Sequence, residues 1–355
     1  MQNWLGLLFI IFALTSGSLP ATDREPQYST WAAQELFPWF QSQPDQFLTS
    51  KVPSAQPVQL RYKSFLIDAA RPQVVIVHGY GERIEKLMEI AFDFHQADYN
   101  VYLYDQRGYG RSTRINPEGK DSIYVDEFVH YKKDLEQFLT EVVGASHSKP
   151  TFLFAHSMGG LVSALLMHDR PDLIAGAVLS APMFSIQLNG VPRRMALLLA
   201  DVASALGFGS SYAFGQVGPR QPEFNDHTGT GSRPRWQAYA DFYSSPEEWP
   251  YALGGASFHW LGEAVRQSIL VDDEAWASQL KTPVLLFQAE NDTFVSAEGQ
   301  DAFCSRAPRC RKVFVPGTRH EIYREQDAPR AAYLKEIWKF LDEQLNNTTA
   351  AATTH

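Results

Sequence analysis

A serine in a tight turn is the first group in this sequence that could do covalent chemistry. The segment TFLFAHSMGGLV, residues 151–162, places an apolar β-type run before Ser157 and a helical pattern directly after it. A serine at such a strand-to-helix turn has a strained backbone, which requires small residues two positions away on each side. Ala155 and Gly159 are both small, although glycine is more common at the first of these positions. The turn predicts a nucleophilic serine, with an ordinary strand-to-helix turn as the alternative.

A serine hydroxyl is a weak nucleophile without a base and an acid, and the sequence offers both at loop positions. Asp292 follows the apolar run PVLLFQAE, and His320 follows the apolar run RKVFV and a Pro-Gly turn. An imidazole can take the serine proton, and a carboxylate can fix the imidazole tautomer and stabilise the imidazolium. The order Ser157, Asp292, His320 therefore predicts a catalytic triad that forms an acyl-enzyme. Asp272 and Asp273 are rival acids, but they precede the strand instead of following it.

Two backbone N–H groups are predicted to stabilise the oxyanion that forms on a substrate carbonyl. Met158 supplies one at the start of the helix after Ser157, and Tyr80, in the sequence HGYG, supplies the other. Asp105 and Arg107, in DQRGYGRS, are expected to hold loop structure. The residues predicted to support the turn and the HGYG loop are His78, Gly79, Gly81, Ala155, His156 and Gly159.

Short apolar runs alternate with helical patterns over most of the chain. Strands are predicted at residues 58–67, 73–77, 100–104, 151–154, 176–180, 283–290 and 311–315, and helices at residues 82–97, 126–143 and 327–345. Such alternation implies parallel crossovers and a doubly wound, mostly parallel sheet of the α/β class. The chemistry is then expected at the carboxyl ends of the strands, where the predicted triad residues lie.

The alternation stops between residues 183 and 274, in an insertion far longer than an ordinary loop. Residues 195–206 and 237–244 have helical patterns, so the insertion is predicted to be a mainly helical cap. Its aromatic residues are Trp236, Tyr239, Phe242, Tyr243, Trp249, Tyr251, Phe258 and Trp260. Together they predict an apolar chamber above Ser157, and for each single residue the alternative is the core of the cap itself.

These patterns divide the chain into a core at residues 58–182 and 275–345, the cap at residues 183–274, an N-terminal extension at residues 23–57 and a tail at residues 346–355. The tail, NNTTAAATTH, is predicted to be disordered because it is polar and lacks large apolar residues.

Residues 1–22 contain no charged side chain and include the apolar run WLGLLFIIFAL, which is too short to span a membrane. The run is typical of a signal peptide, which predicts an exported protein that is periplasmic or membrane-associated. Because no Lys or Arg precedes the run, the segment could instead be an uncleaved membrane anchor, and this alternative stays open. A second alternative is a protein bound peripherally to the cytoplasmic side of the inner membrane.

The net charge of −9 and the absence of any basic run argue against a nucleic-acid partner. Cys304 and Cys310 are the only cysteines. In an oxidising compartment such a close pair would form a disulfide, whereas in the cytosol both would be free thiols, and both alternatives stay open. Two cysteines predict no metal site, and no cofactor is expected.

Five motifs in one order resemble the α/β-hydrolase group of monoglyceride lipases and bacterial lysophospholipases, which has a serine aminopeptidase S33-type hydrolase domain. They are HGYGER, DQRGYGRS, AHSMGG, END and GTRHEIYRE, and the similarity covers residues 58–345. The cap segments SAPMF and GGASFHW are more similar to the bacterial lysophospholipase branch, whereas HGYGER is closer to the monoglyceride lipase form. The resemblance implies an α/β-hydrolase fold with an inserted cap. The functional residues that it implies are Ser157, Asp292, His320, Tyr80 and Met158.

The predicted triad and the resemblance together predict a serine esterase that needs no cofactor. Its expected substrate is the acyl ester of a single-chain lipid, either a lysophospholipid or a monoacylglycerol. The expected source of this lipid is a membrane surface. One alternative is a proline-type serine aminopeptidase on the same scaffold. It would need a carboxylate in the cap to bind a free amine, and the candidates are Glu223, Glu247, Glu248 and Glu263. The other alternative is a non-catalytic binding protein with this fold, against which an intact triad argues.

Overall fold

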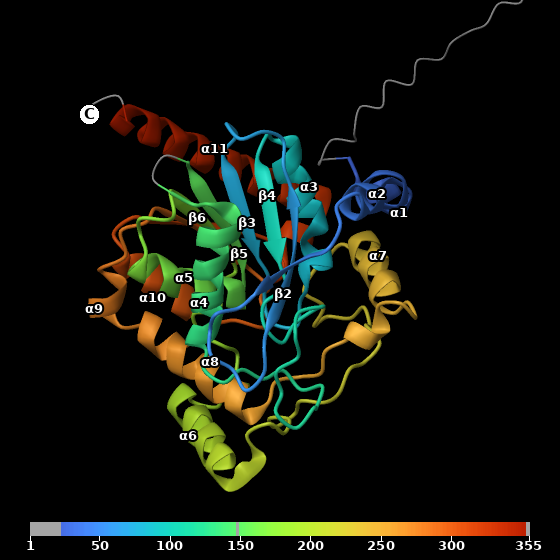
Figure 1. Cartoon of the computed structure of the whole chain (residues 1–355), viewed down its shortest axis with the longest axis vertical. Helices are drawn as coiled ribbons and strands as arrows, with labels where there is room; N and C mark the ends of the chain where they lie inside the picture. Colours follow the sequence, from blue (N-terminus) through green and yellow to red (C-terminus); the bar gives the residue numbers. More distant parts are fainter. Residues whose placement is uncertain (1–22, 147–148, 353–355) are drawn as a thin grey trace, which may run out of the picture.

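An eight-stranded sheet runs through the computed structural model, which describes residues 23–146 and 149–352 (Figure 1). The strand order is β1-β2-β4-β3-β5-β6-β7-β8. β2 is antiparallel to both of its neighbours, and all other pairings are parallel. The strands are β1 (Gln46–Thr49), β2 (Gln59–Phe65), β3 (Gln73–Val77), β4 (Asn100–Tyr104), β5 (Thr151–His156), β6 (Gly176–Ser180), β7 (Val284–Ala289) and β8 (Cys310–Val315). The predicted fold class, a mostly parallel doubly wound sheet, is confirmed.

Helices cover both faces of this sheet (Figure 1). They are α1 (Tyr28–Trp31), α2 (Phe37–Gln41), α3 (Met88–Gln96), α4 (Val129–Phe138), α5 (Met158–Asp169), α6 (Arg193–Ala203), α7 (Arg233–Tyr243), α8 (Phe258–Val271), α9 (Glu274–Ala277), α10 (Ala297–Arg306) and α11 (Asp327–Ala352). One apolar core contains residues of α4 and α5, and a second contains residues of α3 and α11. Because both faces are covered, every residue of the strands β3 to β7 is buried, which explains their continuous apolar runs.

The predicted N-terminal extension, residues 23–57, is part of the core domain in this structure. Its strand β1 pairs with β2 at the edge of the sheet, and Trp31 is buried in the core that contains α3. The Arg24 guanidinium forms ion pairs with Glu89 and Asp93 of α3. Residues 23–57 therefore pack as part of the core, and no domain boundary lies at residue 58. The sequence did not indicate this because a strand of four residues, such as β1, has too little periodicity to be recognised.

The cap lies between β6 and β7, as the interrupted alternation predicted, and contains α6, α7 and α8. The helix α6 packs on α8, and both lie at the lower end of the molecule in Figure 1. The helix α7 is attached to the core differently, because the buried Arg235 forms ion pairs with Glu89 of α3 and Asp327 of α11. The helix α7 is thus tied to the core by ion pairs, whereas α6 lies on α8, which is itself part of the cap.

The C-terminal helix α11 continues to Ala352, so the prediction of a disordered tail at residues 346–355 is wrong for residues 346–352. Alanine has the highest helix propensity, and the three alanines of the tail extend a helix that already exists. Cys304 at the end of α10 and Cys310 at the start of β8 form a disulfide. The predicted signal peptide or anchor, residues 1–22, lies outside the described residues. Among the described helices, none is long and apolar enough to cross a membrane.

Candidate active site

Ser157 lies at the tip of the sharp turn between β5 and α5. Its backbone has φ 51° and ψ −117°, a conformation that residues other than glycine rarely adopt. A Cβ at Gly159 would overlap the carbonyl oxygen of Val77 on the adjacent strand β3, so this position requires glycine. Ala155 is fully buried at the end of β5, and its methyl group is accommodated there. The strained turn places the serine side chain at the carboxyl edge of the sheet.

Asp292 and His320 meet at the same edge, from the loops that follow β7 and β8. The Nδ1 atom of His320 lies 2.7 Å from Oδ2 of Asp292, and both side chains are largely buried. The other carboxylate oxygen, Oδ1, accepts hydrogen bonds from the backbone N–H groups of Phe294 and Val295. Because an ionised carboxylate can only accept, Nδ1 of His320 carries a proton, and its Nε2 is free to accept one.

The environment of Asp292 keeps its carboxyl group ionised. Burial disfavours the charged form, but the attraction of His320 and its hydrogen bond, together with the two backbone N–H donors, outweigh the burial. The net result is a pKa of Asp292 below its usual range. A permanently ionised acid can hold the imidazole in one tautomer over the neutral pH range.

Two backbone N–H groups near Ser157 are free to bind a ligand atom. Met158 is the first residue of α5, where N–H groups have no acceptor within the helix. Within the described part of the chain, the N–H of Tyr80 has no hydrogen-bond acceptor either. Gly79 packs so closely that a Cβ there would lie 3.0 Å from the Cβ of Ser157. Gly81 has φ +68°, which favours glycine at the position after Tyr80.

The buried His78 contacts this loop and the loop after β4 through its two ring nitrogens. Its Nε2 accepts a hydrogen bond from the backbone N–H of Gln106, and its Nδ1 lies 2.8 Å from the carbonyl oxygen of Gly79. Burial lowers the pKa of His78, which favours the neutral ring that both contacts require. The neighbouring Asp105 accepts from the N–H of Ile84, and Arg107 pairs with Asp134, so both residues hold loops.

A buried network behind the site was not predicted from the sequence. Its centre is Glu82, which accepts hydrogen bonds from the N–H of Gly79 at 2.6 Å and from the hydroxyl of Tyr323 at 2.9 Å, and which contacts Nδ1 of His156 at 2.9 Å. Burial opposes its ionisation, but His156 and Lys86 hold the pKa of Glu82 well below its usual range. The carboxylate therefore ties the HGYG loop to the strand end before Ser157. Its only signal in the sequence is its place in HGYGER.

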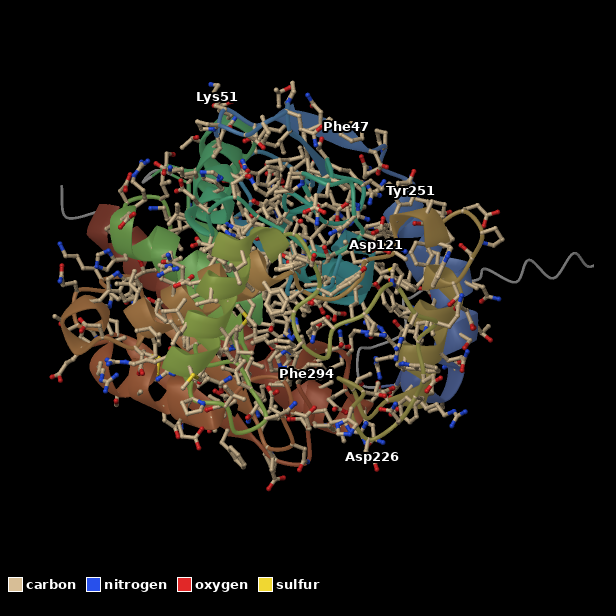
Figure 2. All side chains as sticks on the ribbon, turned by 90° about the horizontal axis from the view of Figure 1, so that it is seen from below. Phe47, Lys51, Asp121, Asp226, Tyr251 and Phe294 are labelled. Atoms are coloured by element: carbon tan, nitrogen blue, oxygen red, sulfur yellow. A yellow bond between two sulfur atoms is a disulfide. The ribbon has the colours of Figure 1, made fainter. Side chains whose placement is uncertain are left out.

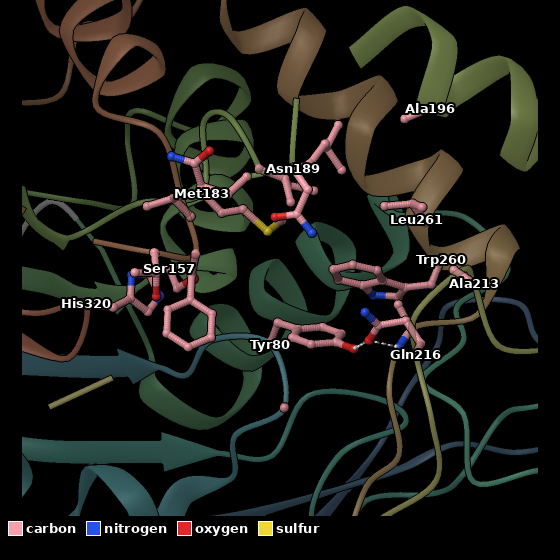
Figure 3. Close-up of a pocket in the computed structure, with 18 of the residues that line it drawn as sticks. Tyr80, Ser157, Met183, Asn189, Ala196, Ala213, Gln216, Trp260, Leu261 and His320 are labelled. Atoms are coloured by element: carbon pink, nitrogen blue, oxygen red, sulfur yellow. Dashed lines mark hydrogen bonds between the residues drawn. The ribbon is translucent and has the colours of Figure 1, made fainter. Parts of the chain in front are cut away.

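Ser157 and His320 both line a cavity of about 580 Å³, which we call the acyl cavity. Figure 3 shows the two residues at one end of this cavity and Trp260 and Leu261 toward the other end. The apolar lining includes Met183, Leu199, Phe214, Phe258, Trp260 and Phe294. Ligand cavities in proteins measure about 300–1,000 Å³, so a small molecule with an apolar part fits this volume.

The predicted cap aromatics are only partly in the acyl cavity. Phe258 and Trp260 of α8 line it, whereas Trp236 and Tyr239 of α7 line a second cavity. The remaining four predicted aromatics, Phe242, Tyr243, Trp249 and Tyr251, line neither of these cavities. The cause is the ionic attachment of α7 at Arg235, which holds this helix against α1 and away from α6.

The rival acids of the sequence lie elsewhere and have other partners. Asp272 pairs with Arg193 and Arg306, and Asp273 accepts a hydrogen bond from the N–H at the start of α9. The carboxylates considered for binding an amine are Glu223, Glu247, Glu248 and Glu263, and none of them lines the acyl cavity. Among the described residues, no group of three His, Cys, Asp or Glu side chains could hold a metal ion.

Comparisons with known proteins identify the family of this chain. A family model for serine aminopeptidase, S33 (Hydrolase_4), matches residues 68–327. The chain belongs to this hydrolase family. Lysophospholipase L2 of Escherichia coli K12 is 31% identical over 295 residues, which are 80% of this chain and 84% of that relative. A probable lysophospholipase L2 of Haemophilus influenzae is 29% identical over 328 residues, which are 90% of this chain and 99% of that relative.

Solved structures of α/β-hydrolases have the same fold. A soluble variant of monoglyceride lipase from Saccharomyces cerevisiae, solved with a substrate analog, has a TM-score of 0.66 at 19% identity and covers 85% of this chain and 95% of its own. A thermostable carboxyl esterase from Bacillus coagulans also has a TM-score of 0.66, at 18% identity, and covers 84% of this chain and 98% of its own. With the relatives above, the predicted group is confirmed, and this hydrolase is a carboxylic ester hydrolase.

Proposed function

We propose that this hydrolase cleaves the acyl ester of single-chain lipids, lysophospholipids or monoacylglycerols, through a Ser-His-Asp triad and an acyl-enzyme intermediate. The observation that carries the proposal is the acyl cavity, in which Ser157 and His320 lie at one end of an apolar chamber. The names of the lysophospholipase and monoglyceride lipase relatives support the substrate class.

In the proposed reaction, Oγ of Ser157 attacks the ester carbonyl while Nε2 of His320 takes its proton. Asp292 stabilises the imidazolium through Nδ1, and the N–H groups of Tyr80 and Met158 bind the oxyanion. His320 then protonates the glycerol oxygen, which leaves. Water, deprotonated by the same nitrogen, attacks the acyl-enzyme, and the fatty acid is released as Ser157 recovers its proton.

The aminopeptidase alternative has less support. A peptidase of this kind needs a carboxylate near the nucleophile to bind the substrate amine, and Glu248 pairs instead with Arg83 and Arg111. Glu263 pairs with Arg266 of the same helix and accepts a hydrogen bond from the backbone N–H of Phe128. The acyl cavity does contain Glu82 and Glu321, but both are already paired with cations of the protein, Glu82 with Lys86 and Glu321 with Lys86 and Arg324.

The experiment that tests this function compares kcat/KM for a lysophospholipid, the matching monoacylglycerol, a diacyl phospholipid and a prolyl naphthylamide. We expect the two single-chain lipids to be hydrolysed and the other two substrates to be poor. Each added methylene of the acyl chain is worth about 0.8 kcal/mol of burial, so kcat/KM should rise up to about fourfold per methylene until the cavity is full. Faster hydrolysis of the naphthylamide would support the aminopeptidase instead.

We also propose that the substrate enters from a membrane surface on which α6 lies. Leu198 and Val202, on the outer face of α6, are 55% and 47% exposed, and the nearby Leu206 is 69% exposed. Leu199 of the same helix lines the acyl cavity, so the apolar surface borders the cavity. The helix lies across the side of the molecule seen in Figure 2. An apolar helix face beside a lipid-binding cavity is suited to insertion between lipid head groups.

Charged residues on this face should therefore impair hydrolysis of lipid in vesicles. An apolar side chain that moves from water into lipid gains about 1.5–3 kcal/mol, so Leu198→Glu with Val202→Glu should lower the rate on vesicle-embedded lysophospholipid by at least about tenfold. The rate on soluble p-nitrophenyl butyrate should not change. Leu270→Glu, at an exposed position on α8, is the matched control and should leave both rates unchanged. Equal losses on both substrates would contradict the membrane role.

Export is the proposed location, supported by the apolar run in residues 1–22 and by the disulfide between Cys304 and Cys310. Mass spectrometry of protein from its native host should find a processed N-terminus and no alkylated cysteine before reduction. An intact Met1 together with two alkylated cysteines would argue for the cytosol.

A further inference from the structure

A second cavity, of about 610 Å³, adjoins the acyl cavity. Lys86 and Glu321 line both cavities, and the Nζ atom of Lys86 lies 2.5 Å from Oε1 of Glu321. This ion pair therefore lies at the boundary where the two spaces meet. Because Glu321 follows His320 directly in the sequence, this boundary lies one residue from the proposed catalytic base.

Two charged side chains of the second cavity have no ionic partner. Lys86 and Arg324 both pair with Glu321, at 2.5 Å each, and Lys86 also pairs with Glu82 at 3.1 Å. Arg220 and Glu223 also line the cavity, and neither forms an ion pair within the described residues. The cavity is open to solvent, and it thus offers one exposed, unpaired guanidinium and one exposed, unpaired carboxylate, which is the charge pattern complementary to a zwitterion.

Aromatic side chains of α7 form another part of the wall. The ring of Trp236 packs edge-on against Phe224 at 5.3 Å, which fixes its orientation. The ring of Tyr239 already carries the Arg324 guanidinium at 5.0 Å from its centroid. Burial raises the pKa of Tyr239 to about 12, so its phenol stays neutral. Aromatic faces attract organic cations. Arginine side chains lie over the rings of Phe224 and Tyr239, whereas no Lys or Arg side chain of the described residues lies over the ring of Trp236.

The wall formed by residues 222–229 is attached to the loop that carries His320. The Arg319 guanidinium donates to the carbonyl oxygen of Asn225 at 2.9 Å, and the backbone N–H of Glu321 donates to the carbonyl oxygen of Gly229 at 2.6 Å. A Cβ at Gly229 would overlap the carboxylate of Glu321, so the two segments are in tight contact. Figure 2 shows Asp226, in this segment, and Phe294, beside the acyl cavity, on the same side of the molecule.

We propose that the second cavity binds the zwitterionic head group of a lysophospholipid, which contains a phosphodiester and an ammonium group. Arg220 binds the phosphodiester, because a guanidinium can donate two parallel hydrogen bonds to phosphate oxygens. Glu223 and Trp236 bind the ammonium group. Only the glycerol unit separates this head group from the ester at Ser157. The inference rests on the proposed function and narrows it, because a monoacylglycerol has no group to occupy this cavity.

Direct binding tests the head-group site without any hydrolysis. The full-length protein is titrated calorimetrically with glycerophosphoethanolamine, which is the head group without an acyl chain, and with inorganic phosphate. We expect the wild type to bind glycerophosphoethanolamine more tightly than phosphate, and Arg220→Ala to weaken that binding by at least about tenfold. Arg194→Ala, which removes an exposed arginine from α6 outside both cavities, is the matched control and should bind as the wild type does.

Kinetics then separate this inference from the proposed function. Arg220→Ala should raise KM for lysophosphatidylethanolamine by about tenfold, leave kcat within twofold and leave all constants for the matching monoacylglycerol unchanged. Arg220→Lys should recover part of the loss, because it keeps the charge. If the wild type hydrolyses neither lipid, the proposed function is wrong, whatever the titration gives. If the wild type is active and Arg220→Ala neither raises this KM nor weakens binding of glycerophosphoethanolamine, the head-group site is wrong and the esterase stands.

Discussion

Ser157→Ala is expected to lower kcat for lysophospholipid hydrolysis by about five to six orders of magnitude, because loss of the nucleophile removes the covalent route. The fold should not change. The hydroxyl of Ser157 makes no hydrogen bond within the described residues, so its removal leaves no buried partner unsatisfied. Steady-state kinetics and labelling by a fluorophosphonate probe measure the loss, and an unchanged melting temperature shows that the protein is still folded.

Ser305→Ala is the control for the loss of a serine hydroxyl. Ser305 is exposed on α10, its hydroxyl donates to the carbonyl oxygen of Ala302, and it does not line the acyl cavity. It should be labelled as strongly as the wild type. Undiminished labelling of Ser157→Ala, or hydrolysis within tenfold of the wild type, would show that another residue is the nucleophile.

The second large effect is expected at the acid–base pair. His320→Ala removes the group that accepts the serine proton and should lower kcat by about five to six orders of magnitude. Asp292→Asn should cost about 10⁴-fold, because an amide at the position 2.7 Å from Nδ1 of His320 cannot hold the productive tautomer. Both losses should appear in kcat more than in KM, since neither side chain is proposed to bind the ground state of the substrate.

The rival acid supplies the control for this pair. Asp273→Asn should keep full activity, because Asp273 accepts only a backbone hydrogen bond at the start of α9. An active Asp292→Asn together with an inactive Asp273→Asn would reverse the assignment of the acid.

The parts of the site that local sequence determines could be predicted. Ser157 stands between a strand and a helix that are both evident in the sequence, and Asp292 and His320 directly follow strands. Parallel strands end at one edge of the sheet, so residues placed after them converge without any knowledge of side-chain packing.

The Glu82 network depends on contacts between distant positions and could not be predicted. Glu82 meets His156 across 74 positions and Tyr323 across 241 positions. The same limit applies to α7, whose place is set by the ion pairs of Arg235 with residues of α3 and α11. Amphipathic patterns identify such a helix but do not say which neighbour it packs on, so they could not show that Trp236 and Tyr239 line a different cavity from Phe258 and Trp260.

The tail and the N-terminal segment were mispredicted for a different reason. Composition indicated disorder after residue 345, but a helix already formed over α11 can extend through alanines at little cost. The strand β1 is short and half-exposed, and it exists because β2 offers it an edge. Both features depend on a neighbour that local patterns do not contain.

The central claim is that lysophospholipid is hydrolysed through an acyl group on Ser157, and a titration tests it most directly. The wild-type protein is treated with increasing amounts of a hexadecyl phosphonofluoridate, which mimics the tetrahedral intermediate. At each step, the occupancy of Ser157 is measured by peptide mass spectrometry and the rate of lysophosphatidylethanolamine hydrolysis is measured in parallel. We predict modification of Ser157 alone and a rate that falls linearly to zero as occupancy reaches one. A rate that persists after Ser157 is fully modified would contradict the account.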